Sequence, residues 1–180
     1  MTNGWWTLML MGLLAGSCHK QATLETVIGQ EMARGESYDS LFLGLDLTLS
    51  KKAFYDSCWQ LNRLGHVRQG PANASVEYIF HDKDQHAIVL NFYPKFTGNR
   101  ISEMVATFTY EAWAPWNRHL ASDSLFGRLK AILPSWYGGS QISVTEAGNE
   151  IYYLIRGNFQ LRMYIRDDRE VTVIYKKIPS

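Results

Sequence analysis

The feature that most constrains the fold of this chain is a series of short apolar or alternating runs, each ended by turn residues. In residues 101–110, Met104, Ala106 and Phe108 would share one face of a strand, because successive side chains of a strand point to opposite faces. Gly, Asn, Asp and Pro separate the runs, as is typical of hairpin turns. The pattern predicts strands at residues 67–69, 75–80, 87–93, 101–110, 141–146, 150–156, 159–166 and 170–176.

A helical pattern precedes each group of four predicted strands. Ser50 is placed to cap a helix over residues 51–64, whose apolar positions recur at helical spacing. A second helix, capped at residues 122–123, is expected to stop at Pro134 because proline lacks the N–H that a helix interior needs. A shorter amphipathic helix is predicted over residues 22–34.

The order helix, four strands, helix, four strands is an internal structural repeat. An amphipathic helix followed by an antiparallel sheet buries its apolar stripe on one sheet face and leaves the other face free. We therefore expect an α+β fold of two tandem helix-plus-antiparallel-sheet units, residues 41–112 and 113–180, after the short N-terminal helix. Together the two repeats would form a single α+β domain, residues 41–180.

The first residues of the chain predict an export signal. An uncharged apolar run from Trp5 to Leu14 gives way to small residues just before Cys18. The run is shorter than the ~20 residues of a transmembrane helix. A cysteine directly after small residues indicates a bacterial lipoprotein signal peptide, residues 1–17, followed by an anchor, short helix and linker, residues 18–40. The alternative is a secreted protein cut near Ser17.

The number of cysteines and the net charge limit the roles that this chain can have. With lipid on Cys18, Cys58 has no intramolecular partner. Cys58 shares a helical stripe with Phe54 and Leu61, which predicts a small core residue rather than a reactive thiol. The 18 basic and 17 acidic residues nearly cancel, so no global field points to nucleic acid.

Candidate catalytic and metal-binding residues form no recognised motif. The densest set of metal-ligand types is the segment from His81 to His86, but a histidine pair five residues apart across a hairpin loop is no established metal spacing. We expect a solvated polar turn there, with no metal and no cofactor. The chain has no phosphate-binding glycine loop and no hydrolase or metalloprotease motif. Residues such as His66 and His119 could still meet in space, so a secreted or anchored hydrolase is the alternative function.

Two sets of side chains are candidates for a binding surface. Arg162, Tyr164 and Arg166 alternate with apolar residues, and Tyr and Arg are enriched at binding hot spots. Solvated strand faces carry the same residue types, so docking and plain solvation both stay open. Trp113 and Trp116, at the joint of the two units, form either an exposed platform or part of the core.

One stretch of the sequence resembles a known family. The run from Leu43 to Phe54, which reads Leu-Gly-Leu-Asp-Leu-Thr-Leu-Ser-Lys-Lys-Ala-Phe, resembles the start of the first helix in small outer-membrane lipoproteins of the SmpA/OmlA type. Thr48-Leu49 stands where that family usually has Gly-Met. The doubled helix-plus-sheet plan also resembles the beta-lactamase-inhibitor-protein fold. These resemblances imply a protein without a catalytic site that binds other proteins, as an assembly factor or an inhibitor, through sheet and loop surfaces.

The sequence as a whole predicts a lipid-anchored protein of the bacterial cell envelope that acts as a non-enzymatic binding or assembly module. A fatty-acyl group such as palmitate on Cys18 would hold it to the membrane. His19 stands where some bacteria require Asp for retention at the inner membrane, which favours the outer membrane, facing the periplasm. We expect a protein partner and no nucleic acid.

Overall fold

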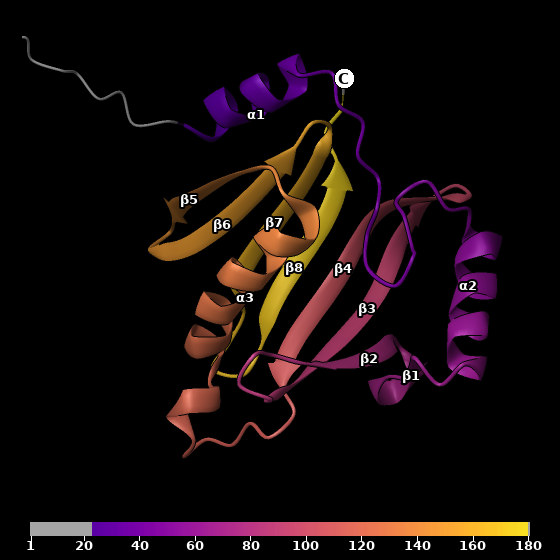
Figure 1. Ribbon diagram of the computed structural model, residues 1–180, viewed down its shortest axis with the longest axis vertical. Coiled ribbons are helices and arrows are strands. Elements are labelled where there is room, and N and C mark those ends of the chain that lie inside the picture. Colours follow the sequence, from indigo (N-terminus) through magenta and orange to yellow (C-terminus); the bar gives the residue numbers. More distant parts are fainter. Residues whose placement is uncertain (1–22, 180) are drawn as a thin grey trace, which may run out of the picture.

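The computed structural model describes residues 23–179, so the expected signal peptide and Cys18 lie outside the described part of the chain. The architecture is broadly α+β, with one large antiparallel sheet and helices packed around it (Figure 1). Its helices are α1 (Leu24–Ala33), α2 (Lys51–Arg63) and α3 (Ser122–Tyr137), with short 3-10 turns η1 (Pro71–Asn73) and η2 (Arg118–Leu120). None of the helices in the described region is long and apolar enough to cross a membrane.

Eight strands form the sheet, in the order β1-β2-β3-β4-β8-β7-β6-β5. The strands are β1 (Arg68–Gln69), β2 (Val76–His81), β3 (Ala87–Thr97), β4 (Arg100–Tyr110), β5 (Ser140–Glu146), β6 (Asn149–Arg156), β7 (Phe159–Ile165) and β8 (Val171–Lys177). Every neighbouring pair is antiparallel. The last strand in sequence therefore lies next to β4 in the middle of the sheet.

The expectation of two tandem helix-plus-sheet units, residues 41–112 and 113–180, is wrong, because all eight strands form one sheet. The β4–β8 ladder joins the two parts, and it places Met104 opposite Tyr175, so that the apolar sides of both strands match. Helix α3 contacts β4 as well as β6, β7 and β8, whereas α2 buries only Phe54 completely. Strands from both ranges thus share one main core.

The sheet is covered on both faces near β6. On one face, Tyr152 and Leu154 belong to the main core with the buried residues of α3. On the opposite face, Val27 of α1 packs with Ile151 and Tyr153 in a second, smaller core. The consecutive buried residues of β6 follow from this arrangement, since a strand buried on both faces has no polar side.

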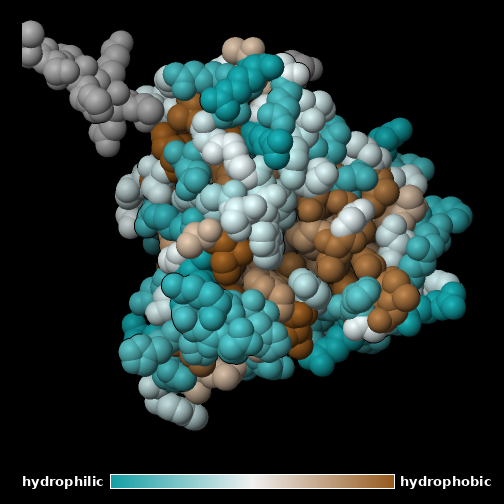
Figure 2. Space-filling model, in the orientation of Figure 1, coloured by the Kyte–Doolittle hydropathy of each residue, from teal (hydrophilic) through white to brown (hydrophobic). Residues whose placement is uncertain are grey.

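The segment between α1 and α2 closes the main core over the centre of the sheet. Leu41, Phe42, Leu45 and Leu47 are all buried, although this segment forms no regular element. The Phe42 ring packs at 4.8 Å from that of Phe92 and at 5.8 Å from that of Tyr175. Figure 2 shows apolar surface between α2 and α3, where this segment lies.

Two prolines lie inside elements that were expected to end at them. Pro94 lies within β3, opposite Met104 of β4. The pairing of β2 with β3 stops at Phe92, so Pro94 has no strand on the β2 side that would need its missing N–H. Helix α3 continues through Pro134 to Tyr137, whose buried side chain is part of the main core. Tertiary packing therefore outweighs the local cost of proline in the helix.

Candidate functional site

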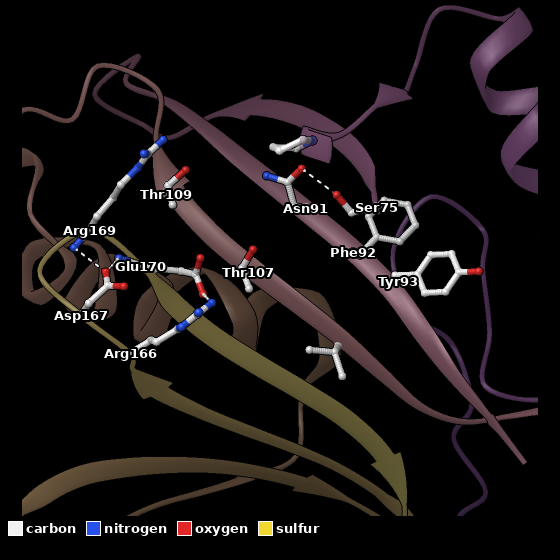
Figure 3. A pocket seen from close by; sticks show the side chains of 12 residues that line it. Ser75, Asn91, Phe92, Tyr93, Thr107, Thr109, Arg166, Asp167, Arg169 and Glu170 are labelled. Atoms are coloured by element: carbon white, nitrogen blue, oxygen red, sulfur yellow. Dashed lines mark hydrogen bonds and ion pairs between the residues drawn. The ribbon is translucent and has the colours of Figure 1, made fainter. Parts of the chain in front are cut away.

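An open groove of about 500 Å³ crosses the sheet face opposite α3 (Figure 3). Outward-facing side chains of β3 and β4 form its floor, and the η1 and β7–β8 turns form two of its walls. The lining residues are Pro71, Ser75, Asn91, Phe92, Tyr93, Val105, Thr107, Thr109, Arg166, Asp167, Arg169 and Glu170.

Strand alternation gives the groove a polar floor. In β4, Phe108 points into the main core, so Thr107 and Thr109 point to the opposite face. The β3–β4 register places Asn91 opposite Thr107. From the η1 side, the Ser75 hydroxyl donates to Oδ1 of Asn91 across 3.3 Å (Figure 3). The floor therefore presents hydroxyl and amide groups that can both donate and accept hydrogen bonds.

The η1 wall comes close to β3 because of Gly70. A Cβ at this position would overlap the Ser75 hydroxyl and Oδ1 of Asn91. The Gly70 N–H donates to the Ser75 carbonyl across 2.9 Å, which closes the turn, and Pro71 begins η1. The width of the groove on this side thus depends on a residue without a side chain.

The β7–β8 turn forms a charged wall whose own charges balance. Arg166 donates to Glu170 Oε1 across 2.8 Å, and this hydrogen bond raises the pKa of Arg166. Oδ1 of Asp167 accepts from the backbone N–H groups of Arg169, at 3.0 Å, and Glu170, at 2.8 Å (Figure 3). Two guanidinium groups and two carboxylates therefore line this wall together.

Trp113 supports the same turn from outside the groove. Its Nε1 donates to the carbonyl of Asp168 across 3.2 Å, and the Arg169 guanidinium lies 5.5 Å from its ring centre. Trp113 is half-buried against the main core, whereas Trp116 is 86 % exposed. The two tryptophans thus differ in burial, and only Trp113 contacts the turn that forms the charged wall.

The binding residues predicted in and just after β7 are only partly in the groove. Arg166 lines it, but Arg162 and Tyr164 do not. The Arg162 guanidinium is held by the Tyr153 hydroxyl at 3.1 Å and by Glu146 at 3.2 Å, and it lies 5.0 Å from the centre of the Tyr164 ring. This cluster supports the sheet beside α1.

The groove also contains residues that the sequence did not single out. Asn91, Thr107, Thr109 and Arg169 line it, yet no sequence motif marks them. The only signal was the alternation of 101–110, which placed both threonines on the face away from the core. The sequence does not show which strand and which turns lie beside these two threonines, because that depends on the order in which the strands pair.

A second cluster connects the β2–β3 loop with α3. The buried carboxylate of Asp82 accepts from the backbone N–H groups of Asp84 and His86, each at 2.9 Å. Its other oxygen lies 3.3 Å from Nε of Arg128 and 3.5 Å from Nδ1 of His86. Burial raises the pKa of Asp82, but the two backbone hydrogen bonds and the charge of Arg128 outweigh it, so the pKa lies below its usual value.

The same loop brings together three metal-ligand types. Ligand atoms of Asp82, Asp84 and His86 all lie within 4.8 Å of one another. Arg128 forms ion pairs with both carboxylates. The guanidinium thus supplies the positive charge that two neighbouring carboxylates require, and the cluster reads as a structural link to α3.

One pocket contains two histidines, either of which could act as the general base of a hydrolase. It has a volume of about 650 Å³, and its lining includes His86, His119, Ser124 and Arg128. His66 lies in a different pocket, beside β1 and β2. The Ser124 hydroxyl donates to the carbonyl of Arg118 at 3.4 Å. Within residues 23–179, no hydroxyl or thiol is hydrogen-bonded to a histidine, as nucleophile activation would need.

The chain shows little similarity to known proteins. No protein-family model matches the chain, and a search of curated proteins finds no match. Among solved structures, the chain is similar to a DUF4309 family protein (YjgB) from Bacillus subtilis at a TM-score of 0.33 and 15 % sequence identity. The similarity covers 84 % of this chain and 95 % of the other. A TM-score of this size does not establish a shared fold or function.

Proposed function

We propose that this protein is a lipid-anchored component of the bacterial cell envelope and acts as a non-enzymatic binding module. The observation that carries the proposal is the open groove, which lies on an uncovered part of the sheet face and is lined by hydroxyl, amide and guanidinium groups. Such groups recognise polar ligands by hydrogen bonding.

The proposed ligand is a segment of a partner protein. The charged wall carries Arg166 and Arg169 but also Asp167 and Glu170, so it attracts neither anions nor cations strongly. The hydroxyl and amide groups of the floor match the polar side chains and backbone of an extended segment. An uncharged or mixed-charge peptide segment fits this lining better than a phosphate or a nucleic acid.

Site-specific photocrosslinking tests the groove. Tyr93 lines it and is 40 % exposed, and replacement by p-benzoylphenylalanine keeps its phenyl ring while removing the 2.6 Å hydrogen bond between its hydroxyl and that of Tyr55. The same replacement of Trp59, which is 62 % exposed on α2, is the matched control. We expect a discrete adduct in cells from position 93 only, and Thr107→Trp should reduce its yield at least about 10-fold. Equal adducts from both positions, or an adduct that survives Thr107→Trp in a folded protein, would contradict the proposal.

The membrane anchor has a separate test. Cells labelled with a palmitate analogue should incorporate the label into the parent protein and not into Cys18→Ser. Fractionation should find the parent protein with the outer membrane, and Cys18→Ser should be absent from that fraction. Labelled Cys18→Ser protein would overturn the lipoprotein assignment without affecting the groove.

The second candidate function is hydrolysis at the pocket that contains His86. The observation that favours it is the buried Asp82 carboxylate, 3.5 Å from Nδ1 of His86. Purified protein should then hydrolyse a nitrophenyl ester, and His86→Ala should remove the activity while His81→Ala, at the end of β2 and outside this pocket, leaves it unchanged. Equal rates for the parent protein and both variants would eliminate this candidate.

A further inference from the structure

The β5 strand forms one free edge of the sheet. It pairs with β6 along its whole length, from Ser140 to Glu146, and with no other strand of the described chain. The other edge strand, β1, has only two residues. An edge strand presents a row of backbone N–H and C=O groups that another strand can pair with.

The geometry of the β5–β6 hairpin shows which backbone groups point outward. Glu146 and Asn149 close it around Ala147 and Gly148, whose φ values of 48° and 83° are those of a type I′ turn. The closing pair of such a turn exchanges hydrogen bonds, and hydrogen-bonded positions then alternate along an antiparallel pair. The backbone groups of the alternate residues therefore point away from β6. These residues are Gln141, Ser143 and Thr145.

This edge lacks the features that usually prevent strand pairing. Residues 140–145 include no charged residue and no proline, and the β5–β6 register has no bulge. Gln141, Ser143 and Thr145 are exposed. Natural sheets usually protect an edge of this length with Lys, Pro or a bulge.

We infer that β5 is a homodimer interface and that its occupant is the β5 strand of a second copy of this chain. Antiparallel pairing about Ser143 places Gln141 opposite the partner's Thr145, with each hydrogen-bonded pair exchanging two backbone bonds. Ile142 lies opposite the partner's Val144, an apolar pair of the kind that stabilises sheets. A two-fold axis through Ser143 makes this contact self-complementary.

Charge and apolar surface both favour a second copy as the occupant. In this register Glu146 lies opposite the partner's Ser140. Lys130, whose Nζ lies 3.4 Å from the Ser143 hydroxyl near the axis, is paired with Glu150 of its own copy at 2.6 Å, so its charge is balanced within each copy. Ile142 and Val144 are half-buried beside Leu24 and Ile28 of α1. Because the two-fold axis is perpendicular to the sheet, the two α1 helices lie on the same face, and their partly exposed apolar side chains approach one another.

Analytical ultracentrifugation of the chain without the expected signal peptide, residues 18–180 carrying Cys18→Ser, tests this inference. The parent should pass from monomer to dimer between about 1 and 100 µM, as expected for a small interface. Thr145→Pro removes an outward N–H without removing a bond to β6, and Thr145→Lys adds a charge to the edge. Both variants should associate at least about 10-fold more weakly. Thr97→Lys, an exposed threonine in β3, should dimerise like the parent.

Two results would overturn the proposed dimer. A parent that stays monomeric at about 100 µM overturns the inference, and so does a dimer that both Thr145 variants retain, because its interface would then lie elsewhere. Circular dichroism of each variant shows whether it has folded, and Thr145→Lys keeps the test valid where the proline variant unfolds. The groove lies over β3 and β4, so failure of the dimer leaves the proposed function unaffected.

Discussion

Gly157, in the β6–β7 turn, packs against the segment that follows α1. It has a φ of +53°, and a Cβ there would overlap the backbone carbonyl of Glu36. We expect Gly157→Ala to lower the free energy of unfolding by about 2–4 kcal/mol, because it combines backbone strain with a steric overlap. Urea denaturation measures the change.

The matched control for this glycine is Gly148, in the β5–β6 turn. Gly148 has a φ of +83°, but a Cβ there meets nothing within 4 Å. Gly148→Ala should therefore cost only the conformational strain, about 1 kcal/mol. Equal costs at both positions would show that the contact with Glu36 contributes nothing.

Cys58 illustrates how packing suppresses a side chain's chemistry. It is half-buried against the main core, and burial raises the pKa of its thiol to about 11. In the Cys18→Ser chain, alkylation by iodoacetamide at pH 8 should be at least about 10-fold slower than in the urea-unfolded chain. The folded rate should keep rising up to about pH 10. A plateau near pH 9 would indicate an ordinary, accessible thiol.

At the scale of elements, the β2–β3 loop is attached to α3 through Asp82 and Arg128. The pKa of Asp82 is lowered in the folded protein, so its carboxylate stabilises the fold above its unfolded pKa near 3.8. This contribution is lost as the pH falls through the folded value. Asp82→Asn should cost about 1–2 kcal/mol at pH 7 and should remove part of the acid-induced loss of stability.

Thermal unfolding at several pH values between about 2 and 7 measures this difference. Asp56→Asn on α2 is the control, since Asp56 forms only an exposed pair with Lys52. The control should follow the parent within about 0.5 kcal/mol at every pH. If the profile of Asp82→Asn also follows that of the parent, the ion pair with Arg128 does not hold the loop.

The positions of most helices and strands were predictable from the sequence. Which strands pair with each other in the sheet was not. Alternation in residues 101–110 located β4, and the N-cap Ser50 located the start of α2. Nothing local shows that β8 pairs with β4, because that choice depends on how apolar faces distant in sequence match. Burial of segment 41–47 was missed because its apolar residues follow neither the helical nor the strand period.

The candidate site was predictable only in part for the same reason. Arg166 was identified because it alternates with apolar residues in the strand that precedes it. Asn91 and Arg169 line the groove only because β3, β4 and the β7–β8 turn come together in the folded sheet. A binding surface assembled from three separate segments leaves no contiguous signature in a single sequence.

At the scale of the whole molecule, the β4–β8 ladder and the shared core lead us to expect that the two parts unfold in a single transition. Hydrogen exchange in increasing urea should remove protection from β3 and from β6 in the same transition. Val173→Ala, at a fully buried position of β8, should lower the stability of both strands equally, by about 2 kcal/mol. Val144→Ala, at the half-buried edge, should cost less. Separate transitions for β3 and β6 would contradict a single cooperative sheet.

The position of β8 also determines when the sheet can be completed. Residues 171–177 occupy the middle of the sheet, although they follow the other seven strands in sequence. Before β8 is in place, β4 pairs only with β3 and β7 only with β6, so the sheet is divided in two and its core is incomplete. Such a folding intermediate exposes two long strand edges, to which a strand of another chain can add.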